Sequence, residues 1–531
     1  MPFMLIRILL VAACCAVACR YFVHMLQLES YQLAGYQRWM RRNRDRLLKN
    51  CVLVGLGGAI LSWYLPVFLS LFIVQSQSRE TIAQWAMLAV FVVVTAVLAF
   101  LDMRAPAKKP LVFTRRVRRL YLCLVFLCLA GATLLSLISL PPYLLYAGNA
   151  YLVMGAAAIM QPVENRINHR FFVQAHKALE ARSDLIKIGI TGSYGKTSTK
   201  FVLRDILSQK YRVLASPASF NTPMGLSRVI NEQLRDEHQV FIAEMGARHV
   251  GDIKELCELV RPKYGLLTSV GPQHLETFGS IENIAGTKYE LIEALPEDGV
   301  AFFSSDGSYV DRLFAKCECE KYRVGFNPDR QPYMLATDLE VGPQGSRFTL
   351  KCADGTSMRC RTRLLGRHNI QNIALCAAVA HKLGLTMEEI ARGVRVIEPI
   401  EHRLQLIPGA MTVIDDAFNS NPAGSQEALN VLSGFPGRRI IVTPGMVEQG
   451  KREDELNYAF GTQMVNCVDV AILVGPNHTR PILQGLVDSG FSREDIHVVS
   501  NLDDASALLR VIGRAGDTVL FENDLPDNYS E

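Results

Sequence analysis

A lysine, a threonine and two glycines form a short segment whose spacing suits phosphate binding. Residues 186–190 are apolar apart from Lys187 and typical of a buried strand, and Gly192 and Gly195 follow within the run Thr-Gly-Ser-Tyr-Gly-Lys-Thr-Ser. The glycines let the backbone approach an anion, whose charge would also face a helix N-terminus and the ammonium group of Lys196. Thr197 adds a hydroxyl of the kind that binds Mg²⁺. We predict a phosphate-binding loop between a strand and a helix.

The fit to the common P-loop is imperfect. That loop has a glycine five positions before its Gly-Lys pair, where this chain has Ile190, and Gly189 comes one place too early. The alternative is a glycine-rich turn with a solvated lysine. The Gly-Lys-Thr-Ser run directly after an apolar strand favours the phosphate loop.

Two further polar residues follow predicted strands. Glu244 lies in the apolar stretch 240–246, and His274 comes after the stretch 264–270. These strands alternate with helical stretches at 200–209, 252–260 and 281–295, which predicts a parallel sheet covered on both faces. Ligands of such sheets bind beyond the carboxyl ends of the strands, so both side chains should meet the glycine loop and offer Mg²⁺ an oxygen and an imidazole ligand. Taken singly, they could be a surface carboxylate and an ordinary loop histidine.

A second, smaller doubly wound unit is predicted near the C-terminus. Its strands fall at residues 411–414, 439–443, 470–474, 497–499 and 518–521, separated by segments of helix length. Closure of this unit over the central one would exclude water from a reactive intermediate.

The N-terminal third is predicted to cross a membrane. Residues 4–19 are apolar apart from Arg7, and three further segments carry no charge, at 51–75, 81–101 and 120–163. The last would measure roughly 66 Å as one helix, about twice the hydrocarbon thickness, and Pro141-Pro142 divides it into two. We therefore expect five transmembrane helices. Because no convincing cleavage site follows the first, it is read as a retained span.

The loop charges predict the orientation of these spans. Arginines gather at residues 38–46, and residues 104–119 hold seven basic residues and no acid. Basic loops stay in the cytoplasm, which places the N-terminus outside and everything after Glu164 in the cytoplasm, where ATP is. Binding of lipid headgroups or substrate is a second use for these basic loops.

These readings divide the 531-residue chain into four parts. A membrane domain spans residues 1–164, and an amphipathic linker helix spans 165–183, with Phe171, Phe172, Ala175 and Leu179 at helical spacing. The central ATP-binding domain covers 184–405 and the C-terminal domain 406–531. The thirteen cysteines include no CxxC pair, which favours reduced thiols. A zinc site of Cys317, Cys319, Cys352 and Cys360 is disfavoured because its CxC spacing is poor.

Six ordered motifs resemble the central and C-terminal domains of the Mur ligases, over about two thirds of the chain. Within that family, the enzymes that add D-alanyl-D-alanine to a UDP-muramoyl tripeptide are the most similar. The resemblance implies an ATP-dependent carboxylate–amine ligase of peptidoglycan synthesis that forms an acyl phosphate. The motifs are residues 191–198, Glu244-Met245-Gly246, His274-Leu275-Glu276 with Phe278-Gly279-Ser280, Gly366-Arg367-His368-Asn369 with Asn372, Glu401-His402-Arg403-Leu404, and Asp415 to Pro422.

The resemblance also implies roles for individual residues. Thr197 and Glu244 would bind one Mg²⁺. His274 and a carbamylated Lys288 would bind a second Mg²⁺, and the alternative for Lys288 is a lysine on a helix surface. Asn372 would contact the adenine of ATP, Arg403 its γ-phosphate and Asp416 its ribose or a phosphate. The alternative for Asn372 is a helix cap, and the alternative for Arg403 is a solvated side chain. The implied phosphate loop consists of Thr191, Gly192, Ser193, Tyr194, Gly195, Lys196, Thr197 and Ser198, and the substrate-proximal loop contains Asn221 and Thr222, with a plain turn as its alternative.

The chain differs from the family pattern in the parts that bear on substrate binding. The family's soluble UDP-binding domain gives way to membrane spans, and residues 444–450 and the C-terminus lack the expected motifs. The expected partners are a cell-wall precursor carboxylate, an amino acid or dipeptide amine and membrane lipid, and no nucleic acid. A lipid-linked precursor is a serious rival to the UDP-linked one. A folylpolyglutamate synthase-like ligase and a non-catalytic ATP-binding scaffold stay open as alternatives.

Overall fold

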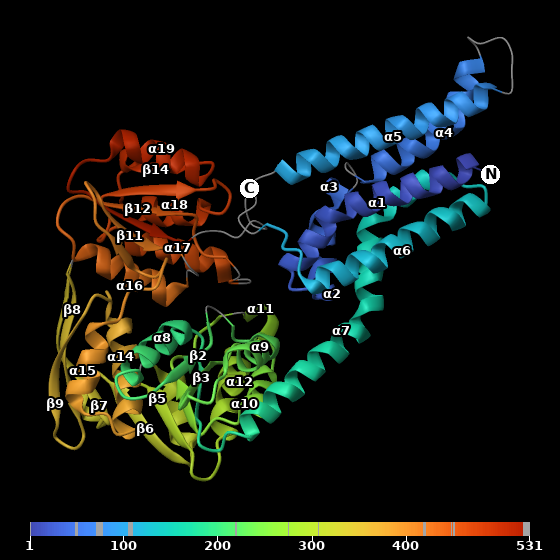
Figure 1. Ribbon diagram of the computed structural model, residues 1–531. Coiled ribbons are helices and arrows are strands. Elements are labelled where there is room, and N and C mark those ends of the chain that lie inside the picture. Colours follow the sequence, from blue (N-terminus) through green and yellow to red (C-terminus); the bar gives the residue numbers. More distant parts are fainter. Residues whose placement is uncertain are drawn as a thin grey trace. The chain divides into compact units, whose positions relative to one another are not determined.

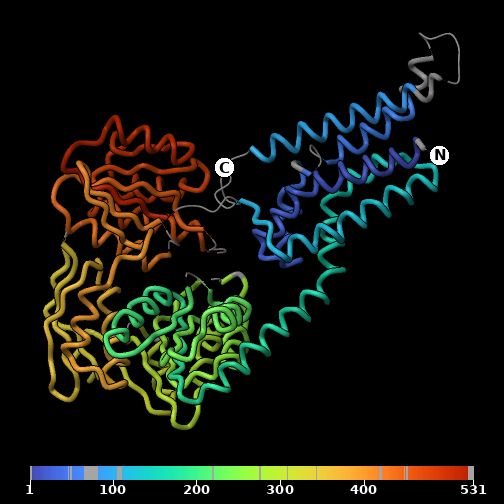
Figure 2. The backbone as a smooth tube through the Cα atoms, in the orientation of Figure 1, coloured from blue at the N-terminus to red at the C-terminus, as the bar shows by residue number. Residues whose placement is uncertain are grey.

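The computed structural model describes residues 2–47, 51–70, 78–104, 110–217, 220–273, 275–305, 307–342, 344–417, 421–447, 449 and 452–523. The chain forms two compact units, Met1–His169 and Arg170–Glu531, which we call the helical unit and the ligase unit. Figures 1 and 2 trace the chain through each unit, and each is described by itself.

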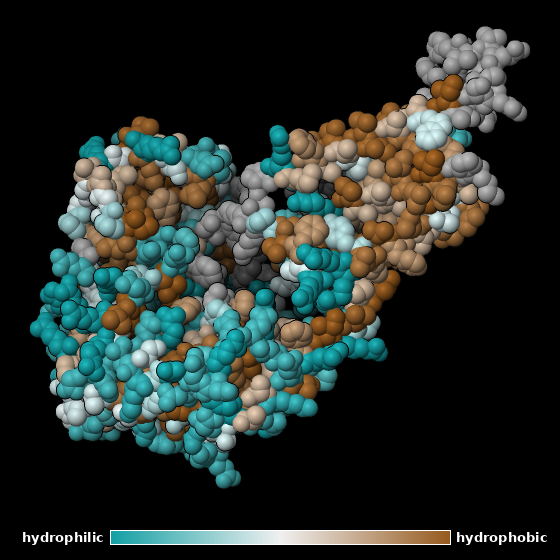
Figure 3. Space-filling view, viewed as in Figure 1, coloured by the Kyte–Doolittle hydropathy of each residue, from teal (hydrophilic) through white to brown (hydrophobic). Residues whose placement is uncertain are grey.

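Among the described residues, four helices are long and apolar enough to cross a membrane, at residues 3–28, 82–104, 115–137 and 142–180, and the last of them continues beyond the helical unit. The described surface of the helical unit is predominantly apolar in Figure 3. The predicted span at 51–75 corresponds to a shorter apolar helix in the described part, and residues 71–75 lie outside it. The elements are α1 (Pro2–Leu28), α2 (Leu33–Arg42), α3 (Arg44–Leu47), α4 (Leu53–Ser70), α5 (Ser78–Arg104), α6 (Arg115–Leu137), η2 (Pro142–Gly148) and α7 (Asn149–Glu180).

The last apolar stretch is divided as its prolines predict. Helix α6 ends at Leu137, and α7 begins after the short η2 turn that starts at Pro142. Helix α7 then continues without interruption to Glu180, so the predicted linker helix is the second half of α7. Ala175 and Leu179 on this half are buried in the core of the ligase unit.

Ion pairs join the helices of the helical unit at one end. The Arg119 guanidinium binds both carboxylate oxygens of Glu164, at 2.7 and 2.8 Å, and Arg20 binds Asp102 at 2.8 Å. Glu164 is buried, and Arg116 approaches it at 3.8 Å. These pairs lie beside the basic segments that the sequence predicts to be cytoplasmic.

A nine-stranded sheet forms the centre of the ligase unit, in the order β2-β3-β1-β4-β5-β6-β7-β8-β9. The pairs from β2 to β7 are parallel, as predicted, whereas β7, β8 and β9 form an antiparallel meander that the sequence analysis missed. The strands are β1 (Ile186–Thr191), β2 (Val213–Ala215), β3 (Val240–Glu244), β4 (Tyr264–Leu267), β5 (Val300–Ser304), β6 (Glu320–Gly325), β7 (Met334–Gly342), β8 (Gly345–Cys352) and β9 (Ser357–Thr362).

Helices pack on both faces of this sheet and bury two separate apolar cores. Helices α8, α14 and α15 contribute to one core, and α9, α10 and α12 to the other. Cys352 and Cys360 belong to the first core, whereas Cys317 belongs to the second with Cys319 packed against it, so the four cysteines form no common zinc site. The helices are α8 (Lys196–Leu207), α9 (Pro223–Gln233), α10 (Asp252–Val260), α11 (Leu275–Phe278), α12 (Ile281–Glu293), α13 (Ser308–Lys316), α14 (Arg367–Lys382) and α15 (Met387–Arg395).

The C-terminal part of the ligase unit is built on a six-stranded sheet in the order β10-β11-β15-β12-β13-β14. All its pairs are parallel except β10 with β11, which agrees with the predicted doubly wound fold. The elements are β10 (Gln405–Ile407), β11 (Thr412–Asp416), α16 (Pro422–Ser433), β12 (Arg439–Thr443), α17 (Glu453–Met464), β13 (Val470–Val474), α18 (Arg480–Asp488), β14 (Ile496–Val499), α19 (Leu502–Ile512) and β15 (Thr518–Glu522).

Candidate nucleotide and metal site

The predicted phosphate loop connects β1 to α8. Gly195 precedes the first residue of α8 with φ +80°, a conformation that favours glycine. A Cβ on Gly192 would lie 2.0 Å from the Thr268 hydroxyl, so the loop approaches its neighbour too closely for a larger residue. The Lys196 ammonium donates to the carbonyl oxygens of Gly192 at 2.6 Å and Ser193 at 3.0 Å. These two hydrogen bonds hold the Lys196 ammonium against the phosphate loop.

The segment after β4 fixes the other side of this loop. Ser193 N–H donates to the Ser269 carbonyl, and Tyr194 N–H donates to the Ser269 hydroxyl, both at 2.9 Å. The Ser193 hydroxyl donates to the Gly271 carbonyl at 3.0 Å. The chain that leads to His274 thus starts against the phosphate loop. His274 itself lies outside the described residues, and its role stays a prediction.

Glu244 is the centre of a buried polar cluster. It is the last residue of β3 and is 1% exposed. Its Oε1 accepts hydrogen bonds from the Thr197 hydroxyl at 3.0 Å and the Asn221 amide at 3.1 Å, and its Oε2 accepts one from Lys200 at 2.9 Å. Thr197 and Asn221, which were predicted from separate motifs, therefore meet at the carboxylate of Glu244, which was predicted from a third.

Lys200 is a member of this cluster that the sequence analysis missed. Its side chain is fully buried, and its ion pair with Glu244 neutralises a charge that would otherwise be costly inside the protein. Its position four residues after Lys196 places both lysines on one face of α8. This spacing is the feature of the sequence that could have identified Lys200 as a residue of the site.

The two substrate-loop residues have different surroundings. Asn221 contacts Glu244, and its carbonyl accepts a hydrogen bond from Gly246 N–H at 2.9 Å. Thr222 is the N-cap of α9, and its hydroxyl accepts from Gly225 N–H at 3.2 Å. The turn-and-cap alternative therefore describes Thr222, whereas Asn221 belongs to the polar cluster.

Two lysines of the site have lowered pKa values. Burial lowers the pKa of Lys288 on α12 to about 7, and the charge of Lys196 contributes. Burial also lowers the pKa of Lys196, to about 8, although Glu244 opposes this shift. Lys288 is 3% exposed, so the alternative of a lysine on the helix surface does not hold. At neutral pH much of Lys288 is the free amine, which is the form that reacts with CO₂.

A cavity of about 190 Å³ lies between the central and C-terminal parts of the ligase unit. Asn372, Arg403 and Asp416, which were predicted to contact ATP, all line it together with Gly195 and Ser198 of the phosphate loop. Asn372 lies inside α14, whose N-cap is Gly366, so the capping alternative does not apply. The sequence analysis missed the apolar wall, which consists of Phe201, Val202, Leu364, Ile397 and Ile400.

Asp416 brings a partly buried carboxylate to this cavity. It ends β11, and its Oδ1 accepts a hydrogen bond from Leu404 N–H at 3.1 Å. Burial and the nearby Glu522 raise its pKa to about 7. Glu522, another residue without an earlier prediction, is 1% exposed and accepts hydrogen bonds from the hydroxyls of Ser425 and Thr443, both at 2.7 Å. Arg403 is buried between the acids of both domains, which oppose the lowering of its pKa by burial.

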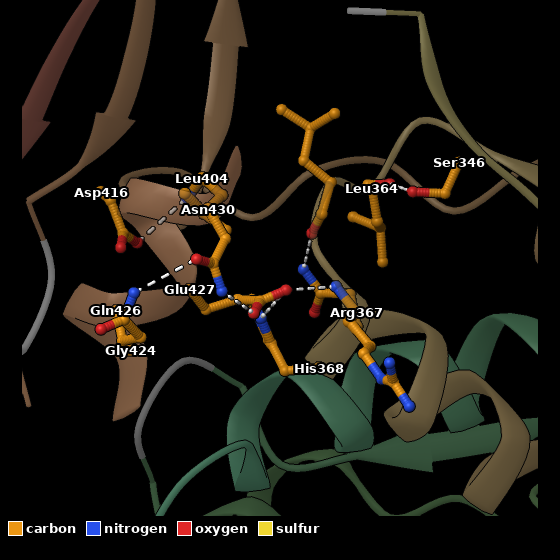
Figure 4. A network of polar contacts seen from close by, with 12 residues as sticks. Ser346, Leu364, Arg367, His368, Leu404, Asp416, Gly424, Gln426, Glu427 and Asn430 are labelled. Atoms are coloured by element: carbon orange, nitrogen blue, oxygen red, sulfur yellow. Dashed lines mark hydrogen bonds and ion pairs between the residues drawn. The ribbon is translucent and has the colours of Figure 1, made fainter. Parts of the chain in front are cut away.

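A polar contact joins the two parts of the ligase unit at the cavity edge (Figure 4). Glu427 of α16 accepts a hydrogen bond from Arg367 N–H at the start of α14, and it lies 3.9 Å from the His368 imidazole. Asn430 donates to the other Glu427 oxygen at 3.3 Å. A carboxylate at a helix N-terminus is favoured by the helix dipole. This contact provides a joint between the two domains next to the candidate ATP site.

Comparison with known families agrees with this architecture. The Mur ligase middle domain matches residues 190–380, and the glutamate ligase domain of Mur ligases matches residues 402–522. With the sequence relatives described below, these matches show that the chain belongs to the Mur ligase family.

Individual relatives show which members of the family this chain is similar to. A UDP-N-acetylmuramoyl-tripeptide--D-alanyl-D-alanine ligase of Bacillus subtilis is 30% identical over 52% of this chain and 59% of its own length. The ligase of the same name from Mycobacterium tuberculosis is 32% identical over 63% of this chain and 69% of its own length. A crystal structure of MurF from Acinetobacter baumannii superimposes with a TM-score of 0.61 at 26% identity and covers 67% of this chain and 77% of that chain. The chain thus spans about three fifths of the Bacillus relative, and the family models match it from residue 190 onward.

Proposed function

We propose that the protein is an ATP-dependent ligase that joins a carboxylate to an amine through an acyl phosphate. By analogy with its relatives, the reaction is the addition of D-alanyl-D-alanine to a muramoyl tripeptide. The observation that carries this proposal is the convergence of the phosphate loop, Glu244, Asn372, Arg403 and Asp416 on one site. A scaffold that only binds nucleotide would not need the additional buried Lys288.

The site fits ATP in both shape and charge. The loop around Gly192 and Gly195 and the α8 N-terminus suit the phosphates, and Lys196 adds a positive charge. The apolar wall beside Asn372 suits a purine, and Arg403 and Asp416 face the same cavity from the other domain. During transfer, Lys196 and Arg403 would stabilise the charge on the γ-phosphoryl group.

The oxygen ligands around Glu244 fit Mg²⁺. Thr197 and Glu244 would hold one ion, which neutralises phosphate charge when it is bound. A second ion would need His274 and a carbamylated Lys288. The burial of Lys288 and its pKa of about 7 support carbamylation, because the reaction consumes the neutral amine. A ¹³C carbamate signal after addition of labelled bicarbonate is expected in the wild type and absent in Lys288→Arg; a signal that persists in the variant would exclude this lysine as its source.

We further propose that the helical unit is a multi-pass anchor in the cell membrane and that the ligase unit is cytoplasmic. Four long apolar helices and the basic segments on one side of them support this arrangement. An anchor would hold the active site near lipid headgroups, which makes a lipid-linked muramoyl peptide a second candidate acceptor.

The direct test is phosphate release by the purified full-length protein. Release should require ATP, Mg²⁺, a muramoyl tripeptide and D-alanyl-D-alanine together, and it should disappear in Lys196→Ala. ATP binding without turnover across UDP-linked and lipid-linked acceptors would support the scaffold instead. Release with a folate acceptor and glutamate alone would support a folylpolyglutamate synthase-like activity.

The acceptor can be identified in cells. Depletion of the protein should cause its acceptor to accumulate, and mass spectrometry distinguishes UDP-linked from lipid-linked muramoyl tripeptides. Accumulation of neither pool would exclude both acceptors as physiological substrates.

A further inference from the structure

One arginine of the helical unit, Arg7, lies among apolar helices and has no charged partner among the residues that the structure describes. Arg7 is near the start of α1, and its Nε is buried with no hydrogen-bond partner in the part of the chain that the structure describes. Arg20 on the same helix is paired with Asp102 at 2.8 Å. An unpaired cation in an apolar environment is costly, and such residues mark ligand sites in membrane proteins.

Arg7 lines a cavity of about 320 Å³ that is rich in hydrogen-bonding groups. Ser136 also lines it, and its hydroxyl is likewise buried and without a partner among the described residues. No aspartate or glutamate occurs among the described lining residues, so no described residue of the cavity supplies a negative charge to neutralise Arg7. The polar side chains of the cavity come from α1, α4, α5, the end of α6 and η2, and are Arg7, Ser62, Gln84, Ser136, Ser139 and Tyr143.

The apolar residues of the same cavity indicate an amphiphilic ligand. Trp63, Met87 and Leu140 line it beside the polar groups, and Trp63 and Leu140 are exposed. The cavity lies where α1 begins and α6 ends, which Figure 1 shows at one end of the helical unit. The charged pairs of Arg119 and Arg20 mark the other end of these helices. Tryptophan is enriched where helices meet the headgroup layer.

We propose that this cavity binds the phosphate headgroup of an anionic lipid. The planar guanidinium of Arg7 would donate to two phosphate oxygens, and the hydroxyl and amide groups would satisfy the remaining ones. The apolar rim would contact the first carbons of the lipid chains. This inference rests on the proposed membrane anchor but not on the ligase reaction, so either can fail alone.

The test is native mass spectrometry of the full-length protein in detergent, equilibrated with equal amounts of phosphatidylglycerol and phosphatidylcholine. The wild type should retain one phosphatidylglycerol in about tenfold preference over phosphatidylcholine. Arg7→Met should lose this preference. Arg166→Met, which removes one exposed cation from α7 outside the basic segments, is the matched control and should behave as wild type.

Each remaining outcome bears on the proposal. Equal retention of phosphatidylglycerol by Arg7→Met and wild type, or equal loss in both variants, would overturn it. If millimolar inorganic phosphate abolishes retention and no preference between the lipids exists, the site binds a soluble anion and the lipid assignment is wrong. Should Arg7→Met fail to fold, Arg7→Lys replaces it; its single ammonium should weaken retention severalfold, and unchanged retention would contradict the role of the guanidinium.

Discussion

Two carboxylates end strands in the two domains of the ligase unit, and their surroundings are opposite. Glu244 ends β3 and has the Lys200 ammonium at 2.9 Å, with a hydroxyl and an amide on its other oxygen. Asp416 ends β11, accepts a backbone hydrogen bond and lies near a second acid, Glu522, and burial together with this acid raises its pKa to about 7. Glu244 is buried and Asp416 is partly buried, and they differ in the charge of the nearest ionisable group.

The comparison indicates that the two domains bring different net charge to the candidate ATP site. The central domain already balances its carboxylate with Lys200, so a cation bound by Thr197 and Glu244, as proposed above, would enter a site of little net charge. The C-terminal domain keeps excess negative charge near the cavity, where Arg403 and the cations that accompany ATP would relieve it. Nucleotide binding would thereby favour contact between the two domains.

The largest expected effect comes from the lysine of the phosphate loop. Lys196→Ala should lower kcat by about three orders of magnitude, because the charge that meets the transferred phosphoryl group is lost. Steady-state phosphate release measures this effect. Lys254→Ala removes an exposed lysine from α10 and should leave kcat unchanged; an equal loss in both variants would mean that Lys196 has no special role.

Substitution of Lys200 tests the first half of the comparison, in which Lys200 neutralises the charge of Glu244. Lys200→Met leaves the Glu244 charge buried and should reduce the free energy of unfolding by about 3–5 kcal/mol. The double variant Lys200→Met/Glu244→Gln should regain part of this loss, because no uncompensated charge remains. Urea titration of the full-length protein in detergent, followed by circular dichroism, gives these values.

The control for that pair is Arg212 with Glu237, an ion pair of similar length at 3.1 Å whose side chains are 69% and 58% exposed. Glu237→Gln should change the free energy of unfolding by less than about 1 kcal/mol. Additive losses from Lys200→Met and Glu244→Gln would show that the buried pair is not coupled.

Asp416→Asn tests the second half of the comparison. The folded state raises the pKa of this acid to about 7, so between its ordinary value and pH 7 the folded protein binds more protons than the unfolded chain. Stability therefore falls as pH rises through this range. The variant lacks this penalty and should be more stable than wild type by about 2–3 kcal/mol at pH 8 and by little at pH 4.

Thermal unfolding at both pH values measures this difference, with the exposed Asp236→Asn as the control. A stability difference that is the same at both pH values would show that Asp416 is ionised normally in the folded protein.

The smallest expected effect concerns the joint between the domains. Glu427→Gln weakens the contacts to Arg367 and His368 and should raise KM for ATP about twofold to fivefold, with kcat nearly unchanged, as the loss of a partly exposed contact worth about 1 kcal/mol predicts. Phosphate release at varied ATP concentration provides both constants. An unchanged KM would mean that this contact does not support the closed arrangement.

The sequence predicted those features that local pattern determines. The phosphate loop follows from glycine spacing after an apolar strand, and Glu244 follows from its place at a strand end. The helix break at Pro141-Pro142 follows from proline geometry. Asn372, Arg403 and Asp416 were found only through family resemblance, because no local pattern marks them as neighbours of the loop.

The missed features depend on tertiary contacts. Lys200 has the sequence appearance of an ordinary helix lysine, and only the position of β3 shows that it is buried against Glu244. Glu522 lies near Asp416 because β15 pairs with β11. The apolar wall combines Phe201 and Val202 of α8 with residues 364, 397 and 400 from much later in the chain. The antiparallel meander from β7 to β9 does carry a turn signal, Asp354-Gly355 between β8 and β9, which the sequence analysis did not use. That the meander continues the edge of the parallel sheet depends on the pairing of β6 with β7, which no local pattern shows.

The central claim, activation of a carboxylate by ATP, has a direct isotopic test. The acceptor tripeptide is prepared with ¹⁸O in its terminal carboxylate and converted by the purified protein with ATP and D-alanyl-D-alanine. An acyl phosphate requires that one carboxylate oxygen leaves with the phosphate, so one ¹⁸O should appear in inorganic phosphate for each amide bond formed. Amide formation with unlabelled phosphate would contradict the proposed chemistry.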